Sequence, residues 1–454
     1  MLIDYLPLFM FAALAVLLFS GYPVAFVLGG VGLGFWLLAV GLGLENDRSF
    51  FLVVGRIYGG VVSNLVLVAI PMFIFMGTML ERSGIARDLL HCLQVLTRRM
   101  PGGLALSVTL LGVIMAATTG IIGASVVMMT LLALPVMVDR GYDKPLATGT
   151  IAASGTLGIL IPPSIMLVVM ADLLSTSAGT LFLAAVVPGL LLSALYLLYL
   201  GTRTALNPAL APPMAVHEAP EGVVAMVRML LGGVLPPLAL IAVVLGSIFG
   251  GVATPTEASG IGAVGATVLA ALKGKLSLAT LRDVAERSAL TGAMLFGLLV
   301  GATAFSYVFT LLGGHELIVA GVDAVGAGAW GVLIVLMITV FLLGFFFDWI
   351  EITLIVLPVF APLIQQLDFA GHVPYPQLTV AWFAILVAVN LQTSFLTPPF
   401  GFALFYMKGV APAGVRIQHI YRGIVPFVLL QILGLAAVMA WPQIALWLPA
   451  KYGG

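Results

Sequence analysis

Charged side chains and cysteines are the scarcest chemical groups in this 454-residue sequence. Asp, Glu, Lys and Arg together make up 8% of the residues, whereas soluble domains carry about 25%, so an ordinary soluble fold is excluded. Cys92 is the single cysteine, which excludes an internal disulfide and a metal site built from thiolates. The formal net charge is zero and the basic residues are scattered, which gives no case for a nucleic-acid partner.

Motifs of enzymes and metal centres are also missing. The five histidines are too dispersed to show metal-ligand spacing. The sequence contains no His-Glu-x-x-His, no Gly-x-Ser-x-Gly and no credible pair of intramembrane aspartates. We therefore expect a protein that is not an enzyme and that carries neither a cofactor nor a transition metal.

Apolar residues dominate instead, at 62% of the chain with a mean hydropathy of +1.22. This composition predicts an all-α integral membrane protein. A spanning helix needs roughly 20 mostly apolar residues. Ten spans are predicted, near 5–20, 23–43, 58–80, 146–175, 180–200, 229–250, 257–272, 288–312, 378–407 and 423–447. Two further apolar stretches, 103–138 and 329–366, are interrupted by tips at 120–125 and 344–351, and we interpret them as re-entrant helical hairpins.

The distribution of basic residues tests this topology. If both hairpins leave on the side they enter, only Arg48, Arg56 and Lys451 of the 18 Lys and Arg residues face one side, and fifteen face the other. Cytoplasmic loops carry the excess of Lys and Arg, so both termini are predicted outside the cytoplasm. Hairpin 103–138 then enters from the cytoplasm and hairpin 329–366 from outside, which makes the two halves inverted repeats.

Proline pairs occur at corresponding positions in the two halves of the chain. Pro162-Pro163 and Pro398-Pro399 each break a predicted span, because proline lacks an N–H and collides with the carbonyl four residues back. Freed carbonyls are tolerated in lipid only where protein or a water-filled cavity satisfies them. Paired broken helices in corresponding places therefore predict the binding site of a secondary transporter.

The predicted organisation is thus two inverted repeats joined by a proline-containing cytoplasmic linker. The parts are a first repeat at 1–201 with hairpin 103–138 and broken helix 146–175, a linker at 202–228, and a second repeat at 229–454 with hairpin 329–366 and broken helix 378–407.

The hairpin tips carry candidate ion-binding groups. Aligning the halves on Pro135 and Pro358 places Ser125 opposite Asp348, and both residue types are good helix N-caps. Carboxylates inside a membrane are costly enough to indicate function, so Asp348 and Glu351 are candidate ion or substrate ligands. Their spacing also fits a capping box, and a purely structural cap is the alternative.

Hydroxyl and amide side chains crowd the tips and breaks, where a hard monovalent cation would find oxygen ligands. They are Thr119, Ser125, Ser154, Thr156 and Ser164 in the first half and Asn390, Gln392, Thr393, Ser394 and Thr397 in the second. Each Ser or Thr could instead bond back to its own helix. Half-helix N-termini aim positive dipole ends inward, which suits an anionic substrate group. The predicted substrate contacts are Ser154, Ser164, Asn390, Gln392 and Pro399.

The sequence also predicts roles for one helix and one acidic residue outside the hairpins. Apolar residues recur at helical spacing before the first hairpin and predict an interfacial helix that supports it. These residues are Ile85, Leu89, Cys92, Leu93, Leu96 and Met100. Asp172, beyond the first break, is expected to reach the outer membrane interface.

Six motifs in order resemble the large membrane subunit of tripartite ATP-independent periplasmic (TRAP) transporters. They are Ile70-Pro71-Met72-Phe73-Ile74-Phe75-Met76-Gly77, Pro101-Gly102-Gly103, Gly141-Tyr142, Ile161-Pro162-Pro163-Ser164, Pro255-Thr256-Glu257-Ala258 and Thr397-Pro398-Pro399. The resemblance covers essentially the whole chain. It implies a sodium-driven elevator transporter of the bacterial inner membrane. Such a transporter imports organic anions delivered by a periplasmic binding protein and works with a small four-helix membrane subunit.

The same resemblance implies one sodium ion at each tip and break. The residues concerned are Thr119, Gly120, Ser125, Gly158 and Pro162 in the first half and Asp348, Glu351, Thr393, Ser394 and Thr397 in the second. Much of the family has a Ser-Gly-Ser-Ser first tip, whereas this chain has fewer hydroxyls there, so backbone carbonyls would have to contribute more. The second tip, Phe347-Asp348-Trp349, is similar to the branch associated with 2-oxo acids, mannitol or chloroaromatic acids. A stand-alone ion-coupled anion permease is the alternative function.

Overall fold

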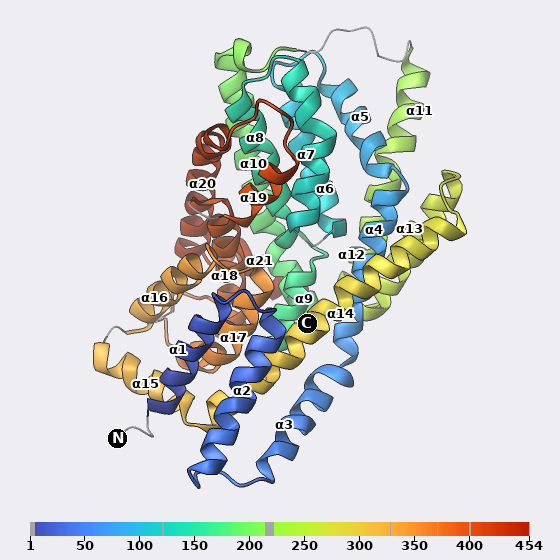
Figure 1. The fold of residues 1–454 in the computed structure, drawn as a ribbon. Coiled ribbons are helices and arrows are strands. Elements are labelled where there is room, and N and C mark those ends of the chain that lie inside the picture. The colour runs from blue at the N-terminus through green and yellow to red at the C-terminus, as the bar shows by residue number, and fades with distance from the viewer. Residues whose placement is uncertain are drawn as a thin grey trace.

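The computed structural model describes residues 5–119, 122–213, 222–326, 328–369, 371–398 and 401–453. Every regular element in these ranges is a helix, which confirms the predicted all-α class. The chain runs through two lobes in Figure 1, with the first hairpin in the upper part of the view and the second in the lower part.

The first half of the chain forms ten α-helices and several short turns of other helix types. The helices are α1 (Leu6–Leu18), α2 (Val24–Gly41), α3 (Ser49–Ile57), α4 (Ala69–Arg82), α5 (Ile85–Thr97), α6 (Gly103–Thr119), α7 (Ile122–Asp139), α8 (Lys144–Thr156), α9 (Ile165–Leu173) and α10 (Ala178–Leu206). A π-helical turn at Tyr58–Val62 extends α3, and a 3-10 turn at Leu157–Ile159 follows α8.

The second half forms eleven α-helices within the described ranges. They are α11 (Val223–Gly233), α12 (Leu235–Phe249), α13 (Pro255–Leu272), α14 (Leu278–Leu311), α15 (Gly314–Val325), α16 (Gly328–Leu343), α17 (Trp349–Gln366), α18 (Thr379–Leu396), α19 (Phe402–Val410), α20 (Ile417–Ala440) and α21 (Gln443–Tyr452).

Eight helical stretches in the described ranges are long and apolar enough to cross a membrane, so this is a multi-pass membrane protein. They are Val24–Gly41, Leu65–Arg82, Ile122–Asp139, Ala178–Leu206, Leu278–Leu311, Trp349–Gln366, Pro376–Leu396 and Ile417–Ala440. Helices α11 and α12 form a further candidate span that is bent by 42°. Both predicted hairpins consist of two helices, α6 with α7 and α16 with α17, but their re-entrance stays a prediction.

Some predicted boundaries were wrong. The span near 58–80 is two pieces, because the π turn after α3 ends at Val62 and a 3-10 turn that leads into α4 starts after Asn64. The span near 423–447 ends early, because Pro442 cannot continue α20 and opens α21 instead. The linker predicted at 202–228 is also shorter, since α10 continues to Leu206 and α11 begins at Val223.

The predicted interfacial helix is α5. Its residues Ile85, Leu89, Cys92 and Leu93 are buried, while Leu96 and Met100 are about half exposed. The buried stripe packs on α4 and α6. This places α5 against the first helix of the first hairpin, as the sequence predicted.

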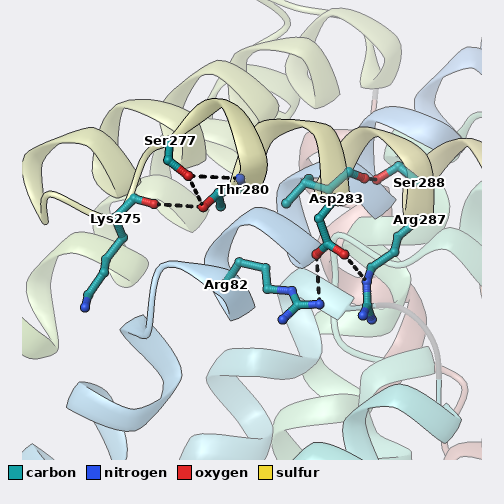
Figure 2. Close-up of polar contacts among 8 residues, drawn as sticks. Arg82, Lys275, Ser277, Thr280, Asp283, Arg287 and Ser288 are labelled. Carbon is teal, nitrogen blue, oxygen red and sulfur yellow. Dashed lines mark hydrogen bonds and ion pairs between the residues drawn. The ribbon is translucent and has the colours of Figure 1, made fainter.

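Helices α2, α4, α13 and α14 form a frame that lies beside the hairpins. Glycine allows α2 and α14 to cross closely, because a Cβ on Gly301 of α14 would overlap the carbonyl oxygen of Ala25 on α2. An exposed ion cluster lies at one end of the frame. Asp283 on α14 accepts from Arg82 at 2.8 Å and from Arg287 at 3.1 Å, as Figure 2 shows.

Candidate functional site

The first hairpin tip lies directly against the broken helix of its own half. Helix α7 packs along α8, and a Cβ on Gly155 would overlap the Val126 side chain and approach its Cα to 3.2 Å. Ser125, the neighbour of Val126, is 3% exposed. The sequence prediction that Ser125 caps this helix was wrong, because α7 begins at Ile122 and places Ser125 inside its first turn.

The second hairpin tip meets its broken helix in a similar way. A Cβ on Gly344, just after α16, would lie 2.6 Å from the Cβ of Ser394 on α18. Only glycine therefore fits at position 344 without moving one of the two elements. Asp348 follows four residues later and begins α17, so its carboxylate lies at the same tip.

Asp348 and Glu351 form the predicted capping box. In this box the Asp348 side chain accepts from the Glu351 N–H, and the Asp348 N–H donates to Glu351 Oε2 at 3.1 Å. Asp348 Oδ1 also accepts from the Trp349 N–H at 2.7 Å. Both carboxylates are partly buried. An ionised carboxylate has about four lone-pair sites on its two oxygens, so the hydrogen bonds of the box leave each carboxylate able to accept further. The cap and an ion-binding role are therefore compatible in geometry.

The first break is partly satisfied by its own side chains. Pro163 cannot donate to the Ile159 carbonyl, and Ser164 Oγ donates to that carbonyl at 2.6 Å instead. Gly158 is buried in the 3-10 turn between α8 and α9. Ser164 is the N-cap residue of α9, but its side chain makes no capping hydrogen bond.

The hydroxyls of the second break bond back to α18. Thr393, Ser394 and Thr397 donate to carbonyls three or four residues earlier, at 2.8–2.9 Å. This is the structural alternative that the sequence left open. A hydroxyl that donates its proton keeps oxygen lone pairs, so the same three oxygens could still coordinate a cation.

Corresponding residues of the two broken helices hold the first helix of each hairpin. Ser154 and Asn390 each lie eight residues before the first proline of their break. Ser154 Oγ bonds Thr109 Oγ1 on α6 at 3.2 Å. Asn390 Nδ2 donates to the Met337 carbonyl on α16 at 2.6 Å. Ser154 and Asn390 therefore each join a broken helix to the first helix of a hairpin. The sequence did not predict this role, because each contact links residues far apart in the chain.

The two breaks also contact each other through corresponding residues. Thr156 and Gln392 each lie six residues before their first break proline, and Gln392 Nε2 donates to Thr156 Oγ1 at 3.4 Å. Gln392 is fully buried, and its Oε1 atom has no hydrogen-bond partner among the described residues. A buried acceptor oxygen without a donor is the arrangement that a bound cation would satisfy.

The predicted substrate residues that the structure describes are all buried. Ser154, Ser164, Asn390 and Gln392 are at most 3% exposed, and substrate contact by them stays a prediction. Gly120 and Pro399 lie outside the described residues, as does the side chain of Thr119. Pro162 is buried beside the first break.

Asp172 has a partner that the sequence did not reveal. Its Oδ1 accepts a short hydrogen bond from Asn64 Nδ2, and Asn64 also donates to the Gly60 carbonyl at 3.2 Å. Asp172 is half-buried, so it joins α9 to the π turn after α3. The Ser63-Asn64 interruption was the only sequence signal for this contact.

Paired hairpins set against paired broken helices, in a chain whose described part has eight helical stretches long and apolar enough to cross a membrane, are typical of a membrane permease. Residues 11–444 match the family model of the tripartite ATP-independent periplasmic transporter DctM component, and the chain belongs to this family. It is therefore a TRAP transporter large permease subunit.

Relatives agree with this assignment, and a solved structure shares the fold. The C4-dicarboxylate large permease protein DctM of Pseudomonas aeruginosa is 31% identical over 85% of this chain and 87% of its own length. The ectoine/5-hydroxyectoine large permease protein UehC of Ruegeria pomeroyi is 29% identical over 96% of this chain and 97% of its own. The fold also resembles the YdaH transporter of Alcanivorax borkumensis, with a TM-score of 0.62, 18% identity and 90% of each chain covered.

Proposed function

We propose that this permease subunit couples the import of a small organic anion to sodium by an elevator mechanism, in which hairpins and broken helices move together against the frame. The observation that carries the proposal is that each tip lies against the break of its own half, at Gly155 with Val126 and at Gly344 with Ser394. Such close packing would let each tip and break move as one body.

Contacts between corresponding residues support an inverted repeat. Thr156 and Gln392 occupy the same position relative to their breaks and bond each other, as residues near a two-fold axis would. Thr130 and Thr353, which the hairpin alignment pairs, are both fully buried. Each donates at 2.6 Å to the carbonyl four residues earlier in its helix.

The oxygen chemistry of the site favours sodium as the coupling ion. The first tip and break offer Ser125 and the buried backbone around Gly158, and the second offers Asp348, Glu351 and the hydroxyls of α18. No group of three or more His, Cys, Asp or Glu side chains among the described residues could hold a metal ion. Carbonyl, hydroxyl and carboxylate oxygens are ligands of hard cations.

Family membership supports two partners and a location. A TRAP permease of this kind would work in the bacterial inner membrane with a small four-helix subunit and a periplasmic binding protein, and with both its termini in the periplasm. The substrates for which the relatives are named differ, since one is a C4-dicarboxylate permease and another an ectoine/5-hydroxyectoine permease. The family alone therefore does not select the anion.

Reconstitution tests this function against a stand-alone permease. The chain is placed in liposomes with and without its small subunit, and uptake of a labelled organic anion is measured with the binding protein outside and an inward sodium gradient. We expect uptake only in the complete system. Sodium-driven uptake by the chain alone would favour the stand-alone permease, and uptake that ignores sodium would reject the coupling.

Cysteine labelling tests the orientation separately. Cys92 is the only cysteine and is buried, so a Cys92→Ser background is silent. Lys275→Cys, in the exposed turn after α13, should react only with a reagent that reaches the cytoplasm. Asp47→Cys, in the exposed loop before α3, should react from outside. The reverse pattern would place both termini in the cytoplasm.

A further inference from the structure

A cavity of about 600 Å³ lies between the second hairpin and helices α1, α14 and α15. Its deep wall is formed by buried residues of α14 and α17, among them Phe309 and Val356, which are both 3% exposed. Its mouth is formed by α1 and α16, where Leu8 and Leu342 are more than half exposed. Helices α1, α15, α16 and α17 lie together at the lower left of Figure 1. The cavity therefore leads from the surface of the helix bundle inward to the second hairpin.

The walls of this cavity are apolar. Among the described residues that line it, Thr339 alone carries a polar side-chain atom, and its hydroxyl donates to the Val335 carbonyl at 2.8 Å. A buried water needs roughly two to four polar partners, whereas an apolar cavity of about 150 Å³ stays dry and binds benzene. The walls therefore favour a hydrocarbon over water or a polar ligand.

The size of the cavity selects among apolar occupants. A membrane-spanning helix is about 10 Å wide and about 30 Å long, so it occupies roughly 2,400 Å³. A helix of the small subunit or of a second copy therefore does not fit inside. The cavity has about four times the volume of the benzene site, which suits one flexible chain of methylene groups.

The mouth of the cavity opens where lipid is present. Helices α14 and α17 are both long and apolar enough to cross a membrane, and the exposed apolar side chains of α1 and α16 beside them face the bilayer. Lipid tails are as apolar as leucine, so a chain gains no hydrophobic energy on entering. What it gains is close dispersion contact with the walls.

One end of the cavity is formed by the second hairpin tip. Phe19 of α1 packs edge-on against Phe346, with ring centroids 5.4 Å apart, and its ring centroid is 6.0 Å from that of Phe347. All three rings line the cavity. Phe347 is followed directly by Asp348, the N-cap residue of α17. A ligand in the cavity therefore lies against the tip that carries the capping carboxylate.

We propose that one acyl chain of a membrane phospholipid binds in this cavity, between the second hairpin and helices α1, α14 and α15. The head group stays outside, because the described residues of the walls offer no charged partner. The bound chain packs on Phe346 and Phe347 and supports the tip that carries Asp348. In the proposed elevator mechanism, a flexible chain would also let α16 and α17 slide along α14, but the binding site does not depend on that mechanism.

Photo-crosslinking tests the site directly. The full chain is reconstituted in liposomes of phosphatidylcholine that carries a diazirine in the middle of one acyl chain, and the adducts formed on illumination are mapped by mass spectrometry. We expect adducts on the buried wall, at Phe309 and Val356, as well as on exposed residues such as Val16, which is 72% exposed. Adducts confined to exposed residues would overturn the proposal.

Matched variants of α1 show whether the buried adducts arise in the cavity. Ala15 lines the cavity, whereas Ala12 on the same helix is exposed and does not line it. Ala15→Phe should reduce the buried adducts about tenfold, because the new ring fills the space, while Ala12→Phe should leave them unchanged. Ala15→Leu is the milder filling variant if Ala15→Phe does not fold. Unchanged buried adducts in the filling variants would contradict the site.

Two further arms identify the occupant. In the first, oleic acid with the same diazirine replaces the labelled phospholipid. Buried adducts from the fatty acid and none from the phospholipid would assign the cavity to a free fatty acid and reject the proposal. In the second, the proposed small subunit is reconstituted with the chain, and we expect the buried adducts to persist. Their loss on assembly would mean that the partner covers the mouth and that no phospholipid chain enters the complex.

Discussion

The two tip-and-break regions are both closely packed through a glycine but differ in chemistry. In both, a glycine lets the hairpin tip touch its own broken helix, and in both a residue eight positions before the break proline holds the first hairpin helix. The first region offers hydroxyls and buried backbone, whereas the second adds the carboxylates of Asp348 and Glu351. The comparison indicates that packing is what the halves must share, and that each half can supply ion ligands differently.

The largest expected effect comes from breaking the shared packing. Gly344→Ala places a Cβ 2.6 Å from the Cβ of Ser394, and such overpacking costs about 1–3 kcal/mol. We expect a lower thermal midpoint of the purified protein and little uptake. Adding Ser394→Gly should recover the thermal midpoint, because it removes both clashing side-chain atoms. Uptake should recover only in part, because Ser394 is one of the proposed ion ligands.

A matched glycine controls for helix propensity. Gly409, in α19, has no atom within 4 Å of an added Cβ, so Gly409→Ala should not lower the thermal midpoint. If Gly344→Ala behaves like Gly409→Ala, the tip does not pack on α18 as described. The parallel test in the first half is Gly155→Ala, which Val126→Ala should rescue if the two regions share their packing.

The second effect in size is the loss of charge at the second tip. Asp348→Asn keeps a good N-cap but removes the carboxylate. If Asp348 contributes to an ion site, the sodium concentration for half-maximal uptake should rise about tenfold, which corresponds to about 1.4 kcal/mol. Uptake measured against sodium concentration checks this.

The capping alternative makes a different prediction for the same pair of variants. Asp348→Ala loses both the cap and the charge, so a pure cap predicts a loss of stability in Asp348→Ala and wild-type sodium dependence in Asp348→Asn. That result would mean that the Asp348 carboxylate caps α17 and does not contribute to sodium binding.

A smaller effect is expected at the first tip. Ser125→Ala removes one neutral oxygen that backbone carbonyls or water can replace, so the half-maximal sodium concentration should rise about threefold. The measurement is the same sodium titration of uptake. A larger shift than in Asp348→Asn would reverse the comparison and make the first region the dominant ion site.

The parts predicted from sequence are those that rest on local chemistry. Pro162 and Pro398 break their helices because a missing N–H acts within one turn, and the Asp348 cap follows from residues three apart. The predicted Ser125 cap was wrong because α7 begins one turn earlier. The tip motif of the family could not correct this prediction, because the first tip of this chain departs from that motif. Ends such as that of α20 were missed where hydropathy continued across Pro442.

Contacts between distant segments could not be predicted from one sequence. The Gly344 and Ser394 contact, the Asn64 and Asp172 bond and the Thr156 and Gln392 pair each join residues far apart in the chain.

The smallest effect is expected outside both regions, at the ion cluster of the frame in Figure 2. Asp283→Asn leaves Arg82 and Arg287 without their carboxylate, but these side chains are 38–57% exposed, and exposed pairs contribute about 0–1 kcal/mol. The thermal midpoint should fall slightly at low salt and hardly at all at high salt, with unchanged sodium dependence of uptake. Because none of these three residues belongs to a tip or a break, a changed sodium dependence here would mean that the two regions do not account for the ion coupling.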